Sequence, residues 1–403
     1  MDDDEHDAND HSPLTEALTP DQTNDAHLKT PKSKKRLILI VAVAIVLLGV
    51  GMAAYFVTKK SETSSDTATN STTSDIKTTG SSATVEEVVA KANAFMATLS
   101  DGQKQTLLQD YSFSNAQKWS NFPQALVSSQ YKRIGLTRGE LNDTQLAALD
   151  TLIKLVTGSG SGEGYDEITQ LLAADDYLAA QGGRMSVDYG RSNYYIAFLG
   201  TPSATDTWEL QYGGHHFALA NTYKNGTLAG ATPSFRGVEP YNGSFTQDGV
   251  TIAPLDSERD AFKALLSGLS SEQLAAAKLS GSYTDLVAGP QKDWSFPSTS
   301  DGVKVSDLSD AQKQLVIAAI ETYVNDLDST DATAIMTKYK NELDNTYVAY
   351  SGTTTMTTRG DYIRIDGPSV WIEFSVQNGI VVQGVHPHSV WRDKTSDYGG
   401  TKS

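Results

Sequence analysis

The sequence predicts an α+β protein that is held to a membrane by one N-terminal helix. Three observations predict this class: one long apolar run, helix-start signals that recur in order, and strand patterns joined by Asn-Gly turns. Helices that precede antiparallel strands, rather than alternate with them, indicate segregated layers instead of a parallel sheet. The 403 residues are enough for two domains or one large one.

Residues 1–36 are predicted to be a disordered acidic tail. Residues 2–28 contain nine acidic side chains and neither Lys nor Arg. So polar a segment buries too little apolar surface to offset the entropy of ordering. The formal charge of the whole chain is −17, which argues against a nucleic-acid partner because such a surface needs a basic stripe.

Residues 37–57 form an uncharged apolar run that is long enough for one membrane span. Four basic residues precede it and two follow it: Lys32, Lys34, Lys35, Arg36, Lys59 and Lys60. The positive-inside rule then places the tail in the cytoplasm and the rest of the chain outside the cell. We predict a signal anchor in the cell membrane, followed by a flexible linker at 58–84 that is rich in Ser and Thr.

Residues 85–250 and 251–403 are predicted to be two copies of one unit. The helix-start pattern Leu-Ser-x-x-Gln at 99–103 recurs at 269–273, and the segment 135–145 recurs at 302–312. The turns Asn225-Gly226 and Asn378-Gly379 each follow a glycine by the same interval. Because these matches keep one order over a long stretch, they predict an internal repeat.

Each half is predicted to begin with a pair of helices and to continue as antiparallel strands with an Asn-Gly hairpin. A Ser or Asp cap precedes a helical apolar period at each helix start. The first half has an extra predicted helix near 165–181. The predicted strands are 194–199, 207–212, 217–223 and 227–231 in the first half, and 347–350, 362–365, 370–376 and 380–385 in the second.

Outside the tail the chain has four histidines, which form two tight pairs: His215, His216, His386 and His388. Imidazole is a common ligand of transition metals and titrates near neutral pH. Aligning the two hairpins places each pair at the open base of its own hairpin. Two halves packed about a pseudo-twofold axis at these bases would bring the pairs together.

The backbone limits how many of these rings can share one ion. His386 and His388 are two apart on a strand and point to one face. His215 and His216 are adjacent, so only one joins them unless the chain turns at Gly213-Gly214; the apolar residues at 217 and 219 favour His216. Three imidazoles leave an open position, as in catalytic zinc sites. A set of imidazoles in a chain without cysteine favours zinc, with copper and iron as alternatives.

Further polar residues are candidates for the same site. Three acids are possible fourth ligands or outer partners: Asp393, Glu373 and Asp397. Arg392 is expected to pair with Asp393. Arg236 and Glu239 are candidates for lining a pocket. Two other interpretations stay open, namely ordinary structural histidines at a sheet edge and proton transfer without a metal.

One combined pattern resembles a known family. Its elements are Gly214-His215-His216, Pro233-x-Phe235-x-Gly237-x-x-Pro240, Arg364-x-x-Gly367-Pro368 and His386-x-His388-x-x-Trp391-Arg392-Asp393. The pattern resembles the domain-of-unknown-function 3500 family of bacterial proteins over about residues 85–400. The resemblance implies a related fold and a shared motif of His215, His216, His386, His388, Arg392 and Asp393. It implies no activity.

Two functional hypotheses follow from the sequence. The first is a membrane-anchored extracytoplasmic metalloprotein, such as a hydrolase or oxidase, whose metal lies between the two halves. The second is a non-catalytic cell-surface module that binds a wall polymer, a small molecule or a partner protein, with the histidines in a structural role.

Overall fold

The computed structural model describes residues 83–182, 188–241, 245–247 and 250–402. Within these ranges no helix combines the length and the apolar character that a membrane crossing requires. The predicted acidic tail, the predicted span at 37–57 and nearly all of the predicted linker lie outside the described residues.

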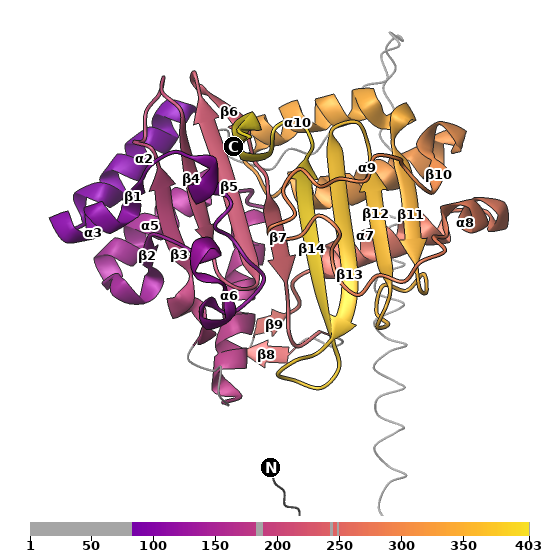
Figure 1. Cartoon of the computed structure of the whole chain (residues 1–403), viewed down its shortest axis with the longest axis horizontal. Helices are drawn as coiled ribbons and strands as arrows, with labels where there is room; N and C mark the ends of the chain where they lie inside the picture. The colour runs from indigo at the N-terminus through magenta and orange to yellow at the C-terminus, as the bar shows by residue number, and fades with distance from the viewer. Residues whose placement is uncertain (1–82, 183–187, 242–244, 248–249, 403) are drawn as a thin grey trace, which may run out of the picture. The chain divides into compact units, whose positions relative to one another are not determined.

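The described residues form a mixed α+β structure around one large, mostly antiparallel sheet (Figure 1). The main strand order is β1 (Leu108–Gln109), β3 (Tyr195–Leu199), β4 (Trp208–Gly213), β5 (Phe217–Lys224), β7 (Ser234–Gly237), β14 (Val385–Asp393), β13 (Val370–Asn378), β12 (Tyr362–Asp366), β11 (Tyr347–Ser351) and β10 (Val303–Lys304). Two more strands pair with β3 and β5, respectively: β2 (Leu136–Thr137) and β6 (Thr227–Gly230). A separate ribbon contains β8 (Phe245–Gln247) and β9 (Val250–Ile252).

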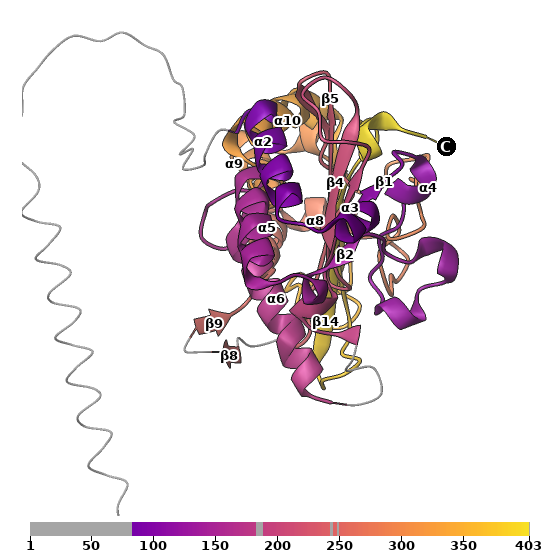
Figure 2. The same ribbon diagram turned by 90° about the vertical axis from the view of Figure 1, so that its left-hand side faces the viewer.

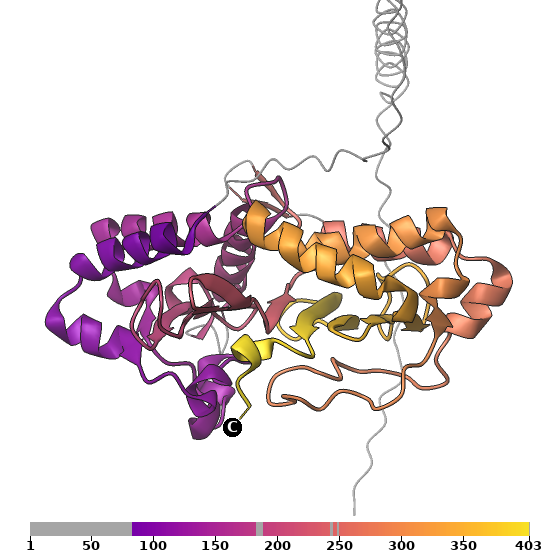
Figure 3. The same ribbon diagram turned by 90° about the horizontal axis from the view of Figure 1, so that it is seen from above.

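Helices cover one face of this sheet, as Figures 2 and 3 show from two directions. They are α2 (Val85–Ala97), α5 (Asp143–Val156), α6 (Gly164–Ala180), α7 (Asp256–Ser267), α9 (Asp310–Val324) and α10 (Ser329–Glu342). At the two outer edges lie α3 (Asp101–Leu107) and α8 (Ser271–Ala277) (Figure 1). The opposite face, here called the loop face, is covered by irregular segments and the short α4 (Phe113–Ala116).

Reciprocal capping boxes start five of the helices, one of them α2, where the cap Thr84 pairs with Glu87. In α3, α8 and α9 the caps are Ser100, Ser270 and Ser309, and the third helical residue is a glutamine that bonds back to the cap. In α5 the cap is Asn142, one residue before the Asp that the sequence pattern suggested. The predicted helix starts are therefore confirmed. Each cap contributes roughly 1 kcal/mol by satisfying an otherwise free backbone N–H.

Seven of the eight predicted strands are confirmed and one was wrong; two strands that bear on the site were missed, as were the short strands β1, β2, β8, β9 and β10. Residues 380–384 form the loop of the β13–β14 hairpin rather than a strand, and the pairing ends at Asn378 and Val385. The two missed strands that bear on the site are β14 and β7. The helix predicted near 165–181 is confirmed as α6, whereas α10, which follows α9, was not predicted.

The missed strands decide where the histidines lie. β7 pairs with β5 on one side and with β14 on the other, so the strands of both halves belong to one continuous sheet. His386 pairs with Gln377 near the closed end of the β13–β14 hairpin. The prediction that both histidine pairs lie at open hairpin bases is thus wrong for the second pair. The turn is formed by the loop at 379–384, and the predicted strand does not exist.

Candidate functional site

The first histidine pair lies in the tight connection between β4 and β5. The Gly214 N–H donates to the Phe217 carbonyl oxygen at 2.9 Å, which closes the reversal. A Cβ atom on Gly214 would lie 2.6 Å from the ring of Tyr194, so only glycine fits there. Because the chain turns, the two rings do not point to opposite faces. His215 and His216 stack with centroids 3.6 Å apart at 32°.

The second pair lies at the start of β14, on the loop face of the sheet. His386 and His388 are separated by Pro387 and point to the same face, as the two-residue period of a strand requires. Their ring centroids are 4.5 Å apart and the ring planes are at 88°. Both side chains are buried, with 3 % of the surface exposed.

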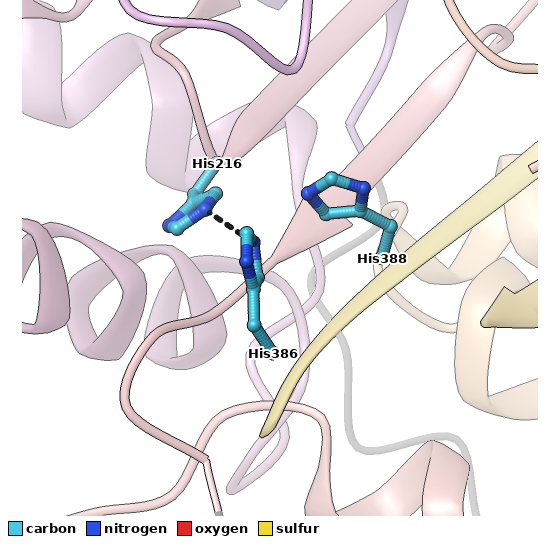
Figure 4. A group of neighbouring side chains, drawn as sticks. All are labelled: His216, His386 and His388. Atoms are coloured by element: carbon cyan, nitrogen blue, oxygen red, sulfur yellow. Dashed lines mark hydrogen bonds between the residues drawn. The ribbon is translucent and has the colours of Figure 1, made fainter. Parts of the chain in front are cut away.

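The structure brings His216 together with this second pair, across 170 positions of sequence. His216 Nε2 lies 3.0 Å from His386 Nε2, and one nitrogen from each of His216, His386 and His388 falls within 4.8 Å of the others. The three rings face a common space in Figure 4. We call these three residues the histidine triad.

Gly237 of β7 makes room for the triad. A Cβ atom at this position would lie 2.9 Å from Cδ2 of His216 and 3.0 Å from Cδ2 of His388. Any larger residue would therefore push two of the three rings apart. The same glycine pairs with His388 in the sheet, so β7 aligns the first half of the chain with β14 at this point.

A carboxylate faces the Nδ1 atom of each ring in the triad. Asp285 Oδ1 lies 3.0 Å from Nδ1 of His388, and Asp175 Oδ1 lies 3.5 Å from Nδ1 of His216. Glu239 Oε2 lies 3.8 Å from Nδ1 of His386. Histidines that bind metals generally direct the second ring nitrogen to a carboxylate, a carbonyl or water, which fixes the tautomer and leaves Nε2 for the ion.

Two of these carboxylates are fixed by further contacts. Glu239 Oε1 accepts hydrogen bonds from three successive backbone N–H groups of the β13–β14 loop, at 2.6–2.7 Å: Ile380, Val381 and Val382. Asp285 accepts from the Gln377 side chain at 2.7 Å. The Asp285 side chain is 41 % exposed, so it marks the side on which the triad is nearest to solvent.

The environment favours the unprotonated form of two rings of the triad, His216 and His386. Burial, followed by the charge of His215, lowers the pKa of His216 to about 3. Burial and the neighbouring His388 hold the pKa of His386 well below its ordinary value. Burial alone would raise the pKa of Asp175, but the attraction and hydrogen bond to His215 outweigh it and the pKa falls. Neutral imidazole is the form that binds a metal, so no proton has to be displaced from these two rings.

Three polar clusters among the described residues bring potential ligand atoms close together, and the triad is the best suited to an ion. The nitrogen lone pairs of an imidazole lie in the plane of the ring. The rings of His215 and His216 lie one above the other, tilted by only 32°, so their lone pairs run side by side and do not converge on one point. This argues against the cluster of Asp175, His215 and His216. The triad rings instead meet at 63°, 64° and 88°. The third cluster, Glu167, Glu258 and Asp326, already surrounds the guanidinium of Arg236.

Buried atoms without hydrogen bonds also point to a missing partner. Within the described part of the chain, His216 Nδ1, His386 Nδ1 and His388 Nε2 are buried and form no hydrogen bond. Such atoms are costly unless something satisfies them. An ion among the Nε2 atoms, with Nδ1–H groups turned toward the three carboxylates, would account for all three.

Of the other residues singled out from the sequence, Glu239 lies beside the triad and the rest take part in other networks. Glu373 accepts from the N–H groups of Val287 and Ala288. Arg392 pairs with Asp397 and Asp293 rather than with Asp393. Asp393 instead accepts from Lys338 and Tyr339, and Arg236 lies among the carboxylates of Glu167 and Asp326.

Sequence reasoning missed two residues of the site, Asp175 and Asp285. Asp175 had a signal, since it lies on the buried face of α6 with Leu171 and Leu178, where an acid is unexpected. Asp285 had none, because it belongs to an irregular segment of the loop face. Asn121, whose amide lies 3.3 Å from His388 Nδ1, was likewise not identifiable.

Replacing Asp285 by asparagine is expected to weaken metal binding by about 10- to 100-fold, the usual effect of removing an outer carboxylate. Asparagine keeps the shape but loses the charge that supports His388. The affinity for zinc would be measured by competition with a chromophoric chelator, using protein without a histidine tag. Asp307→Asn, at an exposed position, should leave the affinity unchanged; equal affinities for both variants would exclude a role for Asp285.

The metal-free protein is expected to lose stability as the pH falls below about 6.5. The pKa of His216 and of His386 is lowered in the folded state. Below pH 6.5 these two rings are therefore protonated in the unfolded chain but remain neutral in the folded chain. Each ring then contributes a loss of up to about 1.4 kcal/mol per pH unit. Between pH 7 and pH 5.5 the free energy of unfolding of the wild type, measured in urea, should fall by about 2–3 kcal/mol more than that of the double variant His216→Gln/His386→Gln.

The double variant is the necessary reference because other groups titrate in the same range. Burial raises the pKa of Glu209 to about 7, which favours the folded state as the pH falls. Both proteins share this contribution, so their difference isolates the two rings. The same pH dependence in both proteins would show that the rings are not held neutral.

A family model described as "Protein of unknown function (DUF3500)" matches residues 81–400, which includes every residue of the site. No curated protein and no solved structure matches the chain.

Proposed function

We propose that this chain, which belongs to the DUF3500 family, is a metalloprotein that binds one transition-metal ion through His216, His386 and His388. One observation carries the proposal: three buried imidazoles converge, and each has a carboxylate facing its second nitrogen. The arrangement is the one that metal sites use to orient their ligands.

Zinc is the ion that these ligands favour, with copper and iron as alternatives. The set is entirely imidazole, and the chain has no cysteine to supply a thiolate. Three protein ligands leave a position for water or substrate, and a zinc ion there would polarise a bound oxygen or lower the pKa of a bound water. The protein's own part is to keep the rings neutral, oriented and shielded from bulk water.

The second candidate is a non-catalytic surface module with structural histidines. The contact at 3.0 Å between His216 Nε2 and His386 Nε2 favours it, because two neutral rings at this distance can share one hydrogen bond. In that case the triad stabilises the junction of β5, β7 and β14, and the protein acts by binding a partner or wall polymer.

Metal analysis of full-length protein purified without a histidine tag separates the two functions. The first predicts about one equivalent of metal in the wild type and almost none in His386→Ala/His388→Ala. In the second, neither protein contains metal beyond trace amounts, and metal addition does not change the melting temperature of the wild type. The latter result would remove the metalloprotein proposal.

The proposed location is the outer side of a cell membrane, with residues 37–57 as the anchor. It is supported by the apolar run and the basic residues that precede it. Alkaline carbonate should leave the full-length protein in the membrane pellet, and protease added to intact cells should cleave it. Release into the supernatant would contradict the anchor.

An internal duplication is also part of the proposal. Gly135 and Gly302, with φ of 94° and 107°, occupy equivalent places before β2 and β10. A Cβ atom on either would lie 2.0 or 2.1 Å from the carbonyl oxygen of Ile196 or Val348, respectively. The glutamines of the capping boxes pair with each other in the same way in both halves. Two equivalent halves explain why the triad draws ligands from both sides of their junction.

A further inference from the structure

A cavity lies on the loop face next to the first histidine pair. The space inside it that a water-sized molecule can occupy is about 30 Å³, between the segment 118–134 and strands β3, β4 and β5. Gly213 and Phe217, which flank the turn that carries His215 and His216, form part of its wall. The remaining wall includes Trp119, Tyr195 and Ala218, so it is largely apolar and aromatic.

Two cations line this cavity and no acid does. Lys118 and Arg133 belong to the lining, which contains neither Asp nor Glu. Among the described residues neither cation forms an ion pair: Lys118 Nζ donates to Asn115 Oδ1 at 2.9 Å, and Arg133 donates to carbonyl and amide oxygens. A local charge of this sign is unexpected in a chain with a net charge of −17.

Arg133 is buried although no carboxylate compensates its charge. Only 8 % of its surface is exposed. Burial lowers the pKa of Arg133 to about 10, and attraction to the phenols of Tyr195 and Tyr194 and to more distant acids offsets only part of this effect. A buried charge without a counter-charge is costly, so an anion that enters the cavity would be stabilised.

We propose that this cavity binds a small oxyanion, a carboxylate or a phosphate, between Lys118 and Arg133. Guanidinium presents a planar fork of five N–H donors that matches such anions. Three of the donors contact Ser120, Phe122 and Gln124, and the other two N–H groups form no hydrogen bond within the described part of the chain. The ammonium of Lys118 supplies the second positive charge, and the apolar wall suits a short organic part.

The position of the cavity connects this anion site to the triad. Arg133 holds the carbonyl oxygens of Ser120 and Phe122, at 2.6 and 2.8 Å, on either side of Asn121. The Asn121 amide in turn lies 3.3 Å from Nδ1 of His388. An anion bound to Arg133 would therefore be linked, through Arg133, to the segment that supports one ring of the triad. The site itself does not depend on a metal.

The test measures anion binding to the full-length, metal-free protein at constant ionic strength. Acetate and inorganic phosphate are titrated by calorimetry, with chloride as the balancing salt. Saturable binding of either anion with one site is the expected result. Acetate alone would identify a carboxylate site, phosphate alone a phosphate site, and both a general oxyanion site. Absence of saturable binding for both anions overturns the proposal.

A pair of matched variants shows whether the binding is in this cavity. Lys118→Met keeps the aliphatic stem and removes the charge, so the dissociation constant should rise about tenfold, as expected for one lost charged hydrogen bond. Lys132→Met, at an exposed neighbouring position outside the lining, should bind like the wild type. Equal binding by both variants would mean a general ionic effect. Arg133→Lys keeps the positive charge but removes the planar set of N–H donors of the guanidinium, and it should weaken anion binding as well.

Discussion

His216→Gln is expected to lose more than about 100-fold in metal affinity, beyond the upper limit for outer partners. The adjacent His215→Gln should remain within about tenfold of the wild type. His216 contributes Nε2 to the triad, whereas the side-chain hydrogen bond of His215 to another described residue is with Asp175, 3.0 Å from its Nδ1. The two residues are neighbours in sequence, both are buried and their rings contact each other, so they form a matched pair.

The measurement is a competition titration with zinc, and the melting temperature without metal serves as the control for folding. Glutamine is polar and close in size to histidine, so both variants should unfold within a few degrees of each other. If His215→Gln lost as much affinity as His216→Gln, the ion would lie in the cluster around Asp175. If neither variant lost affinity, the ion would bind elsewhere.

Local sequence signals predicted five of the helices and seven of the strands. The capping boxes identify four helix starts because Ser or Asn followed by Gln satisfies free N–H groups in a fixed geometry. The alternation of residues in β11, β12 and β13 is equally local. β14 was missed because Pro387 argues against a central strand. It is tolerated because the β7–β14 pairing begins only at His388 and Gly237, one residue further along.

The candidate site was predictable in its residue types but not in its assembly. The rarity of histidine identified the four rings from composition alone. Their convergence depends on β7, which pairs with β5 and β14 at a large sequence separation. No local pattern encodes such a pairing. The roles of Asp175 and Asp285 depend on the same tertiary arrangement, since each meets a histidine that is 40 or more positions away.

Arg236→Met is expected to reduce the free energy of unfolding by about 3–5 kcal/mol, the usual loss when one partner of a buried ion pair is removed. Arg236 connects β7 to the helical layer: it donates to Glu167 Oε2 at 2.7 Å and pairs with Asp326. Its side chain is 1 % exposed. Urea unfolding of the metal-free protein measures the loss. The matched control Arg259→Met removes a more exposed pair with Asp256 and should cost less than about 1 kcal/mol.

A triple variant separates the charge from the packing. Adding Glu167→Gln and Asp326→Asn to Arg236→Met neutralises the carboxylates that the lost cation leaves behind, so stability should recover toward that of the wild type. Glu258 is left unchanged, because burial and the charge of Glu167 raise its pKa well above the ordinary value and so favour its neutral form. If the triple variant were no more stable than Arg236→Met, the loss would come from packing around Tyr323, whose ring Arg236 covers at 5.3 Å. If the triple variant regains stability but still binds metal weakly, the triad depends on more than overall stability: Arg236 also places β7 so that the triad is aligned.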